Sequence, residues 1–177
     1  AVAAAAQDSL RTGDVVPDFT LTDQNQKSVS FKSFRGKVVL ITFLYTRCPY
    51  PDKCPMIAAR LSALRELADR VENGRDRFHI VAVSIDPKKD TPEVLKRYAA
   101  NFHGAGAGMT FLTGKPNDIA RVAGGFGVLY WDNDKGVIDH NLRTALVDPQ
   151  GRIHCFLPGA DWKPGEVAKT IQELLKK

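Results

Sequence analysis

Two cysteines in the first third of the chain could carry either redox or metal-binding chemistry. Cys48 and Cys54 are separated by five residues, and a run of β-branched and aromatic residues, Val38 to Tyr45, precedes them. Pro55 follows Cys54, and proline suits the first position of a helix because no hydrogen bond is lost there. The sequence therefore predicts that both thiols lie between a buried strand and a helix start, where the helix dipole favours thiolate over thiol.

A dithiol at such a junction can exchange disulfides, attack a peroxide or bind a soft metal ion. The peroxiredoxin reaction needs a hydroxyl residue three positions before the cysteine and a proline ahead of that; Tyr45 stands there, and Thr46 is too close to Cys48. Thioredoxin-like exchange usually has two intervening residues rather than five, and a cis-proline where this chain has Arg143. A structural disulfide is not required in a domain of this size. Disulfide exchange stays open, and peroxide reduction is disfavoured.

His140 adds an imidazole to the possible site. It precedes a predicted strand, Thr144 to Val147, in a loop that would face the cysteine loop in a thioredoxin fold. Two thiolates and one imidazole suit Cu(I), which accepts low coordination numbers, and also Cu(II) if a further oxygen or nitrogen ligand joins. Zinc would normally require a fourth ligand, and the spacing shows none. Since thiolates bind only after losing their protons, metal uptake should weaken at low pH.

The elements that must position these residues alternate along the chain. Beyond the first buried strand, the patterns predict strands at Phe78 to Ile85, Met109 to Leu112, Val137 to Asp139, Thr144 to Val147 and Arg152 to Leu157. Helices are predicted from Pro55 to about Val71, after Asp90, from Asn117 to Ala123 and from near Pro164. This order predicts a thioredoxin-like α/β three-layer sandwich. An N-terminal β-hairpin, Pro17 to Phe31, and an extra segment, Gly124 to Gly136, before the last hairpin would be additions to it.

Length and charge limit the other possibilities. The 177 residues suffice for one domain, predicted over residues 16–177, with residues 1–15 as a lead or tether remnant. The net charge of +5 comes from scattered Lys and Arg, which argues against nucleic-acid binding. No apolar stretch is long enough to cross a bilayer. Ala1 to Gln7 is not an intact signal peptide, and could be what remains after a leader or anchor was removed.

Several further residues are predicted to be structural. Cys155 is expected to be a small core residue in its strand. The three other histidines, His79, His103 and His154, are also predicted to be structural. The loop Gly104 to Gly108 lacks the spacing and lysine of a phosphate-binding loop. Tyr130 and Trp131 are expected to be the packed base of a polar turn.

Motifs along nearly the whole chain resemble the SCO/SenC family of copper-binding proteins, which serve the assembly of cytochrome c oxidase. The matching stretches occur in the family's order: Val16 to Leu21, Gly36 to Leu40, Tyr45 to Pro49, Ser84 to Pro87 with Asp90 to Pro92, and Asp139-His140 with Leu146 to Gly151. The chain departs from the family pattern in two places. Five residues rather than three lie between the cysteines, and Asn141 stands where many members have serine.

The resemblance implies that Cys48, Cys54 and His140 are copper ligands, that Cys48 and Cys54 form a redox pair, and that Asp86 lies near the site without binding the metal itself. It also implies delivery of Cu(I) or Cu(II) to the dinuclear centre of oxidase subunit II, or reduction of that centre's cysteines. A metallochaperone is favoured over a thiol-disulfide oxidoreductase. The implied location is extracytoplasmic, in a bacterial periplasm or on the outer face of the cytoplasmic membrane, with a membrane anchor in the full-length form.

Overall fold

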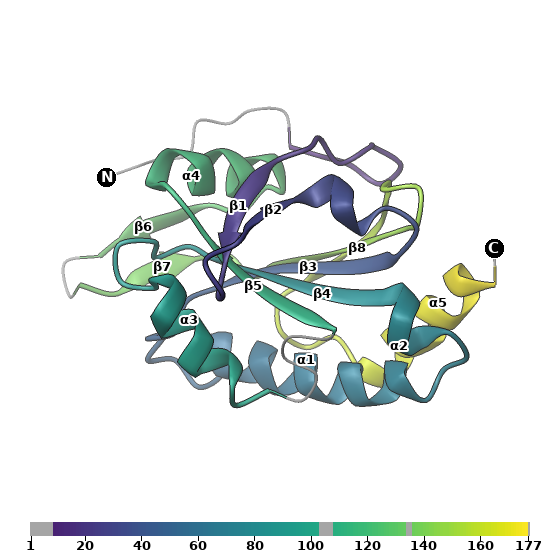
Figure 1. The fold of residues 1–177 in the computed structure, drawn as a ribbon. Coiled ribbons are helices and arrows are strands. Elements are labelled where there is room, and N and C mark those ends of the chain that lie inside the picture. Colours follow the sequence, from purple (N-terminus) through teal and green to yellow (C-terminus); the bar gives the residue numbers. More distant parts are fainter. Residues whose placement is uncertain (1–8, 103–107, 134–135, 177) are drawn as a thin grey trace.

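The computed structural model describes residues 9–102, 108–133 and 136–176. Ala1 to Gln7, His103 and most of the predicted glycine-rich loop, residues 104–107, lie outside the described residues. A seven-stranded mixed sheet runs through the centre of the molecule (Figure 1), with the strand order β2-β1-β5-β4-β3-β8-β9. Its strands are β1 (Thr20–Asp23), β2 (Ser28–Ser30), β3 (Val38–Leu44), β4 (Phe78–Ser84), β5 (Met109–Thr113), β8 (Arg143–Val147) and β9 (Ile153–Pro158).

Helices cover both faces of this sheet, which makes three layers (Figure 1). The helices are α1 (Cys54–Asp69), α2 (Gly74–Arg77), α3 (Pro92–Ala99), α4 (Pro116–Gly125) and α5 (Pro164–Leu175), with a 3-10 turn η1 (Phe31–Phe34). The crossovers β3-α1-β4 and β4-α3-β5 step across the sheet in one direction, so right-handed connections place α1 and α3 on one face. Helix α5 packs on α1, and α4 lies on the opposite face. The predicted thioredoxin-like sandwich is therefore confirmed.

Strands β3 and β4 form the buried centre, and their pairing decides where the functional loops meet. All seven residues of each strand are buried, which explains their continuous apolar sequences. The two strands are parallel, with Val38 opposite Phe78 and Leu44 opposite Ser84. Because parallel strands end at the same edge of a sheet, the loop that carries Cys48 begins beside the loop that follows β4.

The predicted N-terminal hairpin is present and extends the sheet. Strand β1 pairs with β2 and also with β5, so the hairpin continues the edge of the central sheet. The preceding residues attach to the same body: the amide of Leu10 donates to the Gly125 carbonyl, and Val15 forms an isolated bridge with Arg152. Each helix in the described part of the chain falls short of the length and apolarity that crossing a bilayer requires.

The extra segment contributes one strand of a second, two-stranded hairpin, and the Asn133 amide donates to the Val137 carbonyl across the turn between the two strands. Strands β6 (Tyr130–Asp132) and β7 (Ile138–His140) form this hairpin beside the main sheet. The prediction that Trp131 is packed is wrong, because its side chain is 50% exposed. Helix α4 also continues past its predicted end through Gly124 and Gly125. The chain leaves the helix at Gly127, whose φ of 71° is the left-handed conformation that glycine adopts without strain.

Candidate metal centre

The two predicted cysteines lie at the junction of β3 and α1, as expected. Cys54 is the first residue of α1, one position earlier than predicted, and its side chain is 1% exposed. Cys48 is half-buried in the loop, with its Sγ 3.9 Å from the Tyr50 carbonyl oxygen. Both thiols are free, and Cys48 is close enough to Cys54 to raise the pKa of its thiol.

His140 meets the same junction from the far side. It ends β7, is 6% exposed, and places its Nε2 at 3.4 Å from Cys54 Sγ. Its Nδ1 lies 2.9 Å from the Asn141 carbonyl oxygen. A carbonyl can only accept, so Nδ1 carries the proton, and in the neutral ring Nε2 presents its lone pair to Cys54. Burial lowers the pKa of His140, which favours this neutral form.

The expectation that the helix terminus favours a thiolate is wrong for Cys54. Burial raises the pKa of its thiol to about 12, and the neighbouring Cys48 adds to the rise. Backbone hydrogen bonding at Tyr45 and at Cys54 itself lowers it by less. The thiol is removed from water, and desolvation penalises the charged form more than one uncapped helix end favours it. Cys54 is therefore a protonated thiol that can donate to His140.

Tyr45 completes the floor of the site. It directly follows β3, is 3% exposed, and its ring meets the His140 ring edge-on at a centroid distance of 6.0 Å. Burial raises the pKa of Tyr45, and the charges of Cys48 and then Cys54 act in the same direction. In the sequence, Tyr45 ends a buried strand, belongs to a matching stretch and argues against a peroxidase, but nothing there predicts the contact of its ring with His140.

Asp90 fixes the start of the cysteine loop. Its carboxylate is fully buried and accepts from the amide and hydroxyl of Thr46, at 3.0 and 2.6 Å, and from the Ser84 hydroxyl at 2.6 Å. The sequence predicted a helix start at Asp90 to Glu93 with a capping hydroxyl, and this is confirmed, because Thr91 Oγ1 accepts from the Val94 amide. No local pattern could have shown that three donors from β4 and the cysteine loop converge on Asp90.

Asp86 is connected to the cysteine loop by an ion pair. Its carboxylate accepts from Arg47 at 2.9 Å, and this ion pair connects the loop after β4 with the residue before Cys48. Both side chains line a cavity of 280 Å³ whose wall also contains Tyr45 and Ile138. Asp86 therefore acts on the cysteine loop through Arg47.

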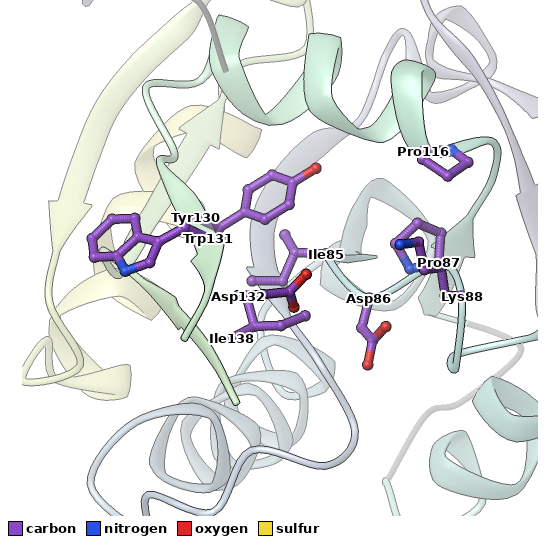
Figure 2. Close-up of a pocket in the computed structure, with 9 residues that line it drawn as sticks. All are labelled: Ile85, Asp86, Pro87, Lys88, Pro116, Tyr130, Trp131, Asp132 and Ile138. Carbon is purple, nitrogen blue, oxygen red and sulfur yellow. The ribbon is translucent and has the colours of Figure 1, made fainter. Parts of the chain in front are cut away.

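A neighbouring recess of 130 Å³ separates the loop after β4 from the β6–β7 hairpin. Figure 2 shows the carboxylate of Asp132 on the recess side of the hairpin, opposite the loop that carries Asp86. The side chains of Tyr130 and Trp131 extend from β6 in opposite directions, as successive residues of a strand do (Figure 2). The phenol thus lines the recess, and the indole faces outward.

Asn141 holds the histidine loop in place. Its Oδ1 accepts from the Leu129 amide at 2.9 Å, and its Nδ2 donates to the Gly127 carbonyl at 3.0 Å, while its own carbonyl accepts from His140. The departure from serine at this position therefore supplies a two-pronged side-chain anchor. The sequence marked the departure but gave no sign of its partners.

The remaining histidines and cysteine in the described part of the chain differ in burial. His79 is buried in β4 and bonds to Thr110 at 2.8 Å, and His154 is exposed on β9. Cys155 packs against the core but is only half-buried, because β9 is an edge strand, so the prediction of a core residue is confirmed only in part. Arg143, which the sequence predicts at the position of the thioredoxin cis-proline, lies over the Phe156 ring at 3.8 Å.

Comparison with known proteins identifies the family. The SCO1/SenC family model matches residues 7–176. An SCO2-like protein of Rickettsia typhi is 36% identical over 178 residues, covering 96% of this chain and 79% of that protein. The chain therefore belongs to the SCO1/SenC family.

Solved structures agree with this assignment. The structure of Bradyrhizobium japonicum ScoI with copper bound is 30% identical, has a TM-score of 0.76, and covers 92% of this chain and 100% of that one. An SCO1/SenC family lipoprotein from Bacillus anthracis is 26% identical with a TM-score of 0.80, covering 94% of this chain and 99% of that one. The thioredoxin-like fold of this family is thus shared along almost the full length of both.

Proposed function

We propose that this protein binds one copper ion through Cys48, Cys54 and His140 and delivers it during assembly of cytochrome c oxidase. The observation that carries the proposal is the 3.4 Å contact between Cys54 Sγ and His140 Nε2, beside the free thiol of Cys48. Two sulfurs and an imidazole form a donor set that suits Cu(I). Family membership and the copper bound to Bradyrhizobium japonicum ScoI support the same cargo.

The state of His140 supports its assignment as a ligand. A metal-binding histidine commonly donates its second ring N–H to a carbonyl or carboxylate, which fixes the tautomer and the ring plane. Here Nδ1 is bonded to the Asn141 carbonyl, and Nε2 faces the sulfur. The imidazole therefore needs no tautomer change or rotation to accept a metal.

Cys48 must turn to complete the set. Within residues 9–102, 108–133 and 136–176, no three His, Cys, Asp or Glu side chains are gathered closely enough to enclose a metal ion. Cys54 and His140 are already in contact, whereas Cys48 Sγ lies nearest the Tyr50 carbonyl of its own loop. The five intervening residues leave this loop enough length for a rotation of Cys48 toward its partners.

The recipient that we propose is the dinuclear copper centre of oxidase subunit II. We place the protein outside the cytoplasm, anchored to the membrane in its full-length form, and the Bacillus anthracis relative is described as a lipoprotein. Residues 1–15 are proposed as the lead or tether remnant, and residues 16–177 as the copper-binding domain.

One observation favours a second function, reduction of cysteine pairs. Cys48 is half-exposed and Cys54 is buried, and the two thiols are free and close. This is the arrangement in which an accessible thiol attacks a substrate disulfide and a protected thiol resolves the mixed disulfide. The substrate would be the cysteine pair of the oxidase copper centre or of another extracytoplasmic protein.

Copper titration of a histidine variant tests the proposal. We expect the reduced wild type to bind one Cu(I) and one Cu(II) in separate titrations, and His140→Ala to lose tight binding, by about 100-fold or more, because one of three ligands is missing. His154→Ala, which removes an exposed imidazole from β9, is the matched control and should bind as the wild type does.

Dithiol exchange separates the two functions. His140→Ala should reduce a model disulfide at close to the wild-type rate, because both thiols remain. Stoichiometric, tightly bound copper in His140→Ala would contradict the assignment of His140. A wild type that takes up no copper but reduces disulfides would favour the reductase.

A further inference from the structure

Tyr45 carries a buried hydroxyl that the structure leaves unsatisfied. Its side chain is 3% exposed, and among the described residues none forms a hydrogen bond of acceptable geometry with Tyr45 Oη. A buried, unpaired polar group loses its hydrogen bonds to water and gains none in return, which costs free energy. A phenylalanine ring would fill the same space without this cost. The hydroxyl therefore needs a partner that the side chains do not offer as they stand.

The surroundings of the hydroxyl indicate which partner this is. Burial has the largest effect on the pKa of Tyr45, and Cys48, three residues further along the same loop, has the next largest; both raise it. Cys54 raises it further, and the Ile138 backbone lowers it. The ring is edge-on to His140. All three candidate copper ligands thus surround one phenol, and Cys48 is the ligand that must still turn to reach the other two.

We propose that Tyr45 donates a hydrogen bond to the Cys48 sulfur once that sulfur is a copper-bound thiolate. This inference rests on the proposed function. A neutral thiol is a weak acceptor, whereas a thiolate is a strong one, and charge-assisted hydrogen bonds are shorter and stronger than neutral ones. The bond that is missing beside a thiol therefore forms when Cys48 loses its proton to bind the metal. Tyr45 is a positioning residue, because it acts on the metal only through Cys48.

The hydrogen bond changes the properties of the copper as well as the position of the sulfur. A donor on a cysteine sulfur draws electron density away from the metal–sulfur bond, and so favours the reduced metal. Its loss should therefore lower the Cu(II)/Cu(I) potential and strengthen electron donation from sulfur to Cu(II). Partners that orient a metal ligand typically contribute 10- to 100-fold to metal affinity.

Tyr45→Phe tests this inference, because it removes the hydroxyl and keeps the ring. We expect the sulfur-to-Cu(II) charge-transfer band to move to longer wavelength, the Cu(II)/Cu(I) potential to fall, and Cu(I) retention against a chelator to weaken about tenfold. Without copper, the midpoint of urea unfolding should be no lower than that of the wild type, since the hydroxyl has no partner to lose. Tyr130→Phe, which removes a half-buried phenol from β6, is the matched control and should leave the band and the potential unchanged.

Four outcomes would overturn the inference. A Tyr45→Phe variant with the band and potential of the wild type would show that the hydroxyl makes no bond to the loaded site. A phenolate-to-Cu(II) band in the wild type that Tyr45→Phe abolishes would show that Tyr45 binds the metal directly. A lowered unfolding midpoint without copper would show a purely structural role. A wild type that binds no copper would overturn this inference and the proposed function together, whereas the first three leave the proposed function standing.

Resonance Raman spectra of the wild type give a second measurement that needs no variant. Tyrosine bands should change from those of a free hydroxyl to those of a hydrogen-bond donor when Cu(I) is added. Unchanged tyrosine bands on full copper loading would contradict the proposal.

Discussion

At the scale of single residues, the proton on Cys54 connects copper binding with pH. Burial raises the pKa of this thiol to about 12, so near neutral pH it is protonated, and copper can bind only as the proton leaves. Apparent affinity should therefore rise with pH by about tenfold per unit for each proton released. This direction matches the weakening at low pH that the sequence predicts.

Proton release during Cu(I) titration in weakly buffered solution measures this effect directly. The wild type should acidify the solution in proportion to the copper bound, and Cys54→Ser should release fewer protons per copper. Copper affinity that is independent of pH between about 6 and 8 would contradict protonated Cys54.

The same residue shows where sequence reasoning ends. The position of Cys54 at a strand-to-helix junction follows from the apolar run before it and from Pro55 after it. Its exposure does not follow, because the surfaces that cover it come from β7 and from the core, distant in sequence. The helix-end argument was thus correct in geometry and wrong in its electrostatic result, and the contact with His140 could be expected only from family resemblance and fold topology.

At the scale of elements, Asp90 couples the end of β4 with the cysteine loop. We expect Asp90→Asn to lower the free energy of unfolding by about 3 kcal/mol. The amide NH2 of asparagine would replace one carboxylate oxygen, and it would face an N–H or O–H group of Thr46 or Ser84 that needs an acceptor. Urea unfolding without copper measures the loss. Asp161→Asn, which changes an exposed carboxylate, is the control and should stay within about 0.5 kcal/mol of the wild type.

Copper binding by the same variant tests what the anchor does for the site. If Asp90 holds the start of the cysteine loop, Asp90→Asn should also retain copper less tightly, since the loop must then be ordered at the cost of binding energy. A variant with wild-type stability would show that the buried hydrogen bonds are replaceable, and would contradict this role.

Elements were predicted well where burial alone determines the pattern. The continuous apolar sequences of β3 and β4 and the helix-start signals at Pro55, Pro92 and Pro164 all fall within a few residues of the observed elements. Strand β6 was missed because it is only three residues long. Tyr130 packs against the core and Trp131 is exposed, and this single alternation is too short a pattern to predict a strand. The role of Asn141 as an anchor was not predicted, because its hydrogen bonds to Gly127 and Leu129 depend on how the loops fold and not on a periodic sequence pattern.

At the scale of the whole molecule, one buried histidine makes the stability of the fold depend on pH. His79 lies in β4 against Phe34, and its pKa is lowered from 6.5 to about 4, first by burial and then by the charges of Lys37 and Arg65. The unfolded chain therefore binds a proton at this residue at a higher pH than the folded protein does. Stability from His79 is fully present above about pH 6.5 and is lost progressively as the pH falls toward about 4.

The expected loss from this residue is about 3 kcal/mol across that range. Urea unfolding at a series of pH values measures it, with His79→Gln expected to flatten the profile and His154→Ala, which removes an exposed side chain of β9, expected to leave it unchanged. An equally steep profile in His79→Gln would assign the pH dependence to other groups.

The exposed indole on β6 gives this molecule a built-in optical probe. The chain has two tryptophans; Trp162 is 8% exposed, whereas Trp131 is 50% exposed and is the register partner of Asp139, the neighbour of His140. Their emission should therefore differ in wavelength, with the shielded indole serving as an internal reference. Fluorescence from the strand opposite the histidine can then follow, in real time and without a label, both the arrival of a quenching metal and the approach of any protein that covers that side of the hairpin.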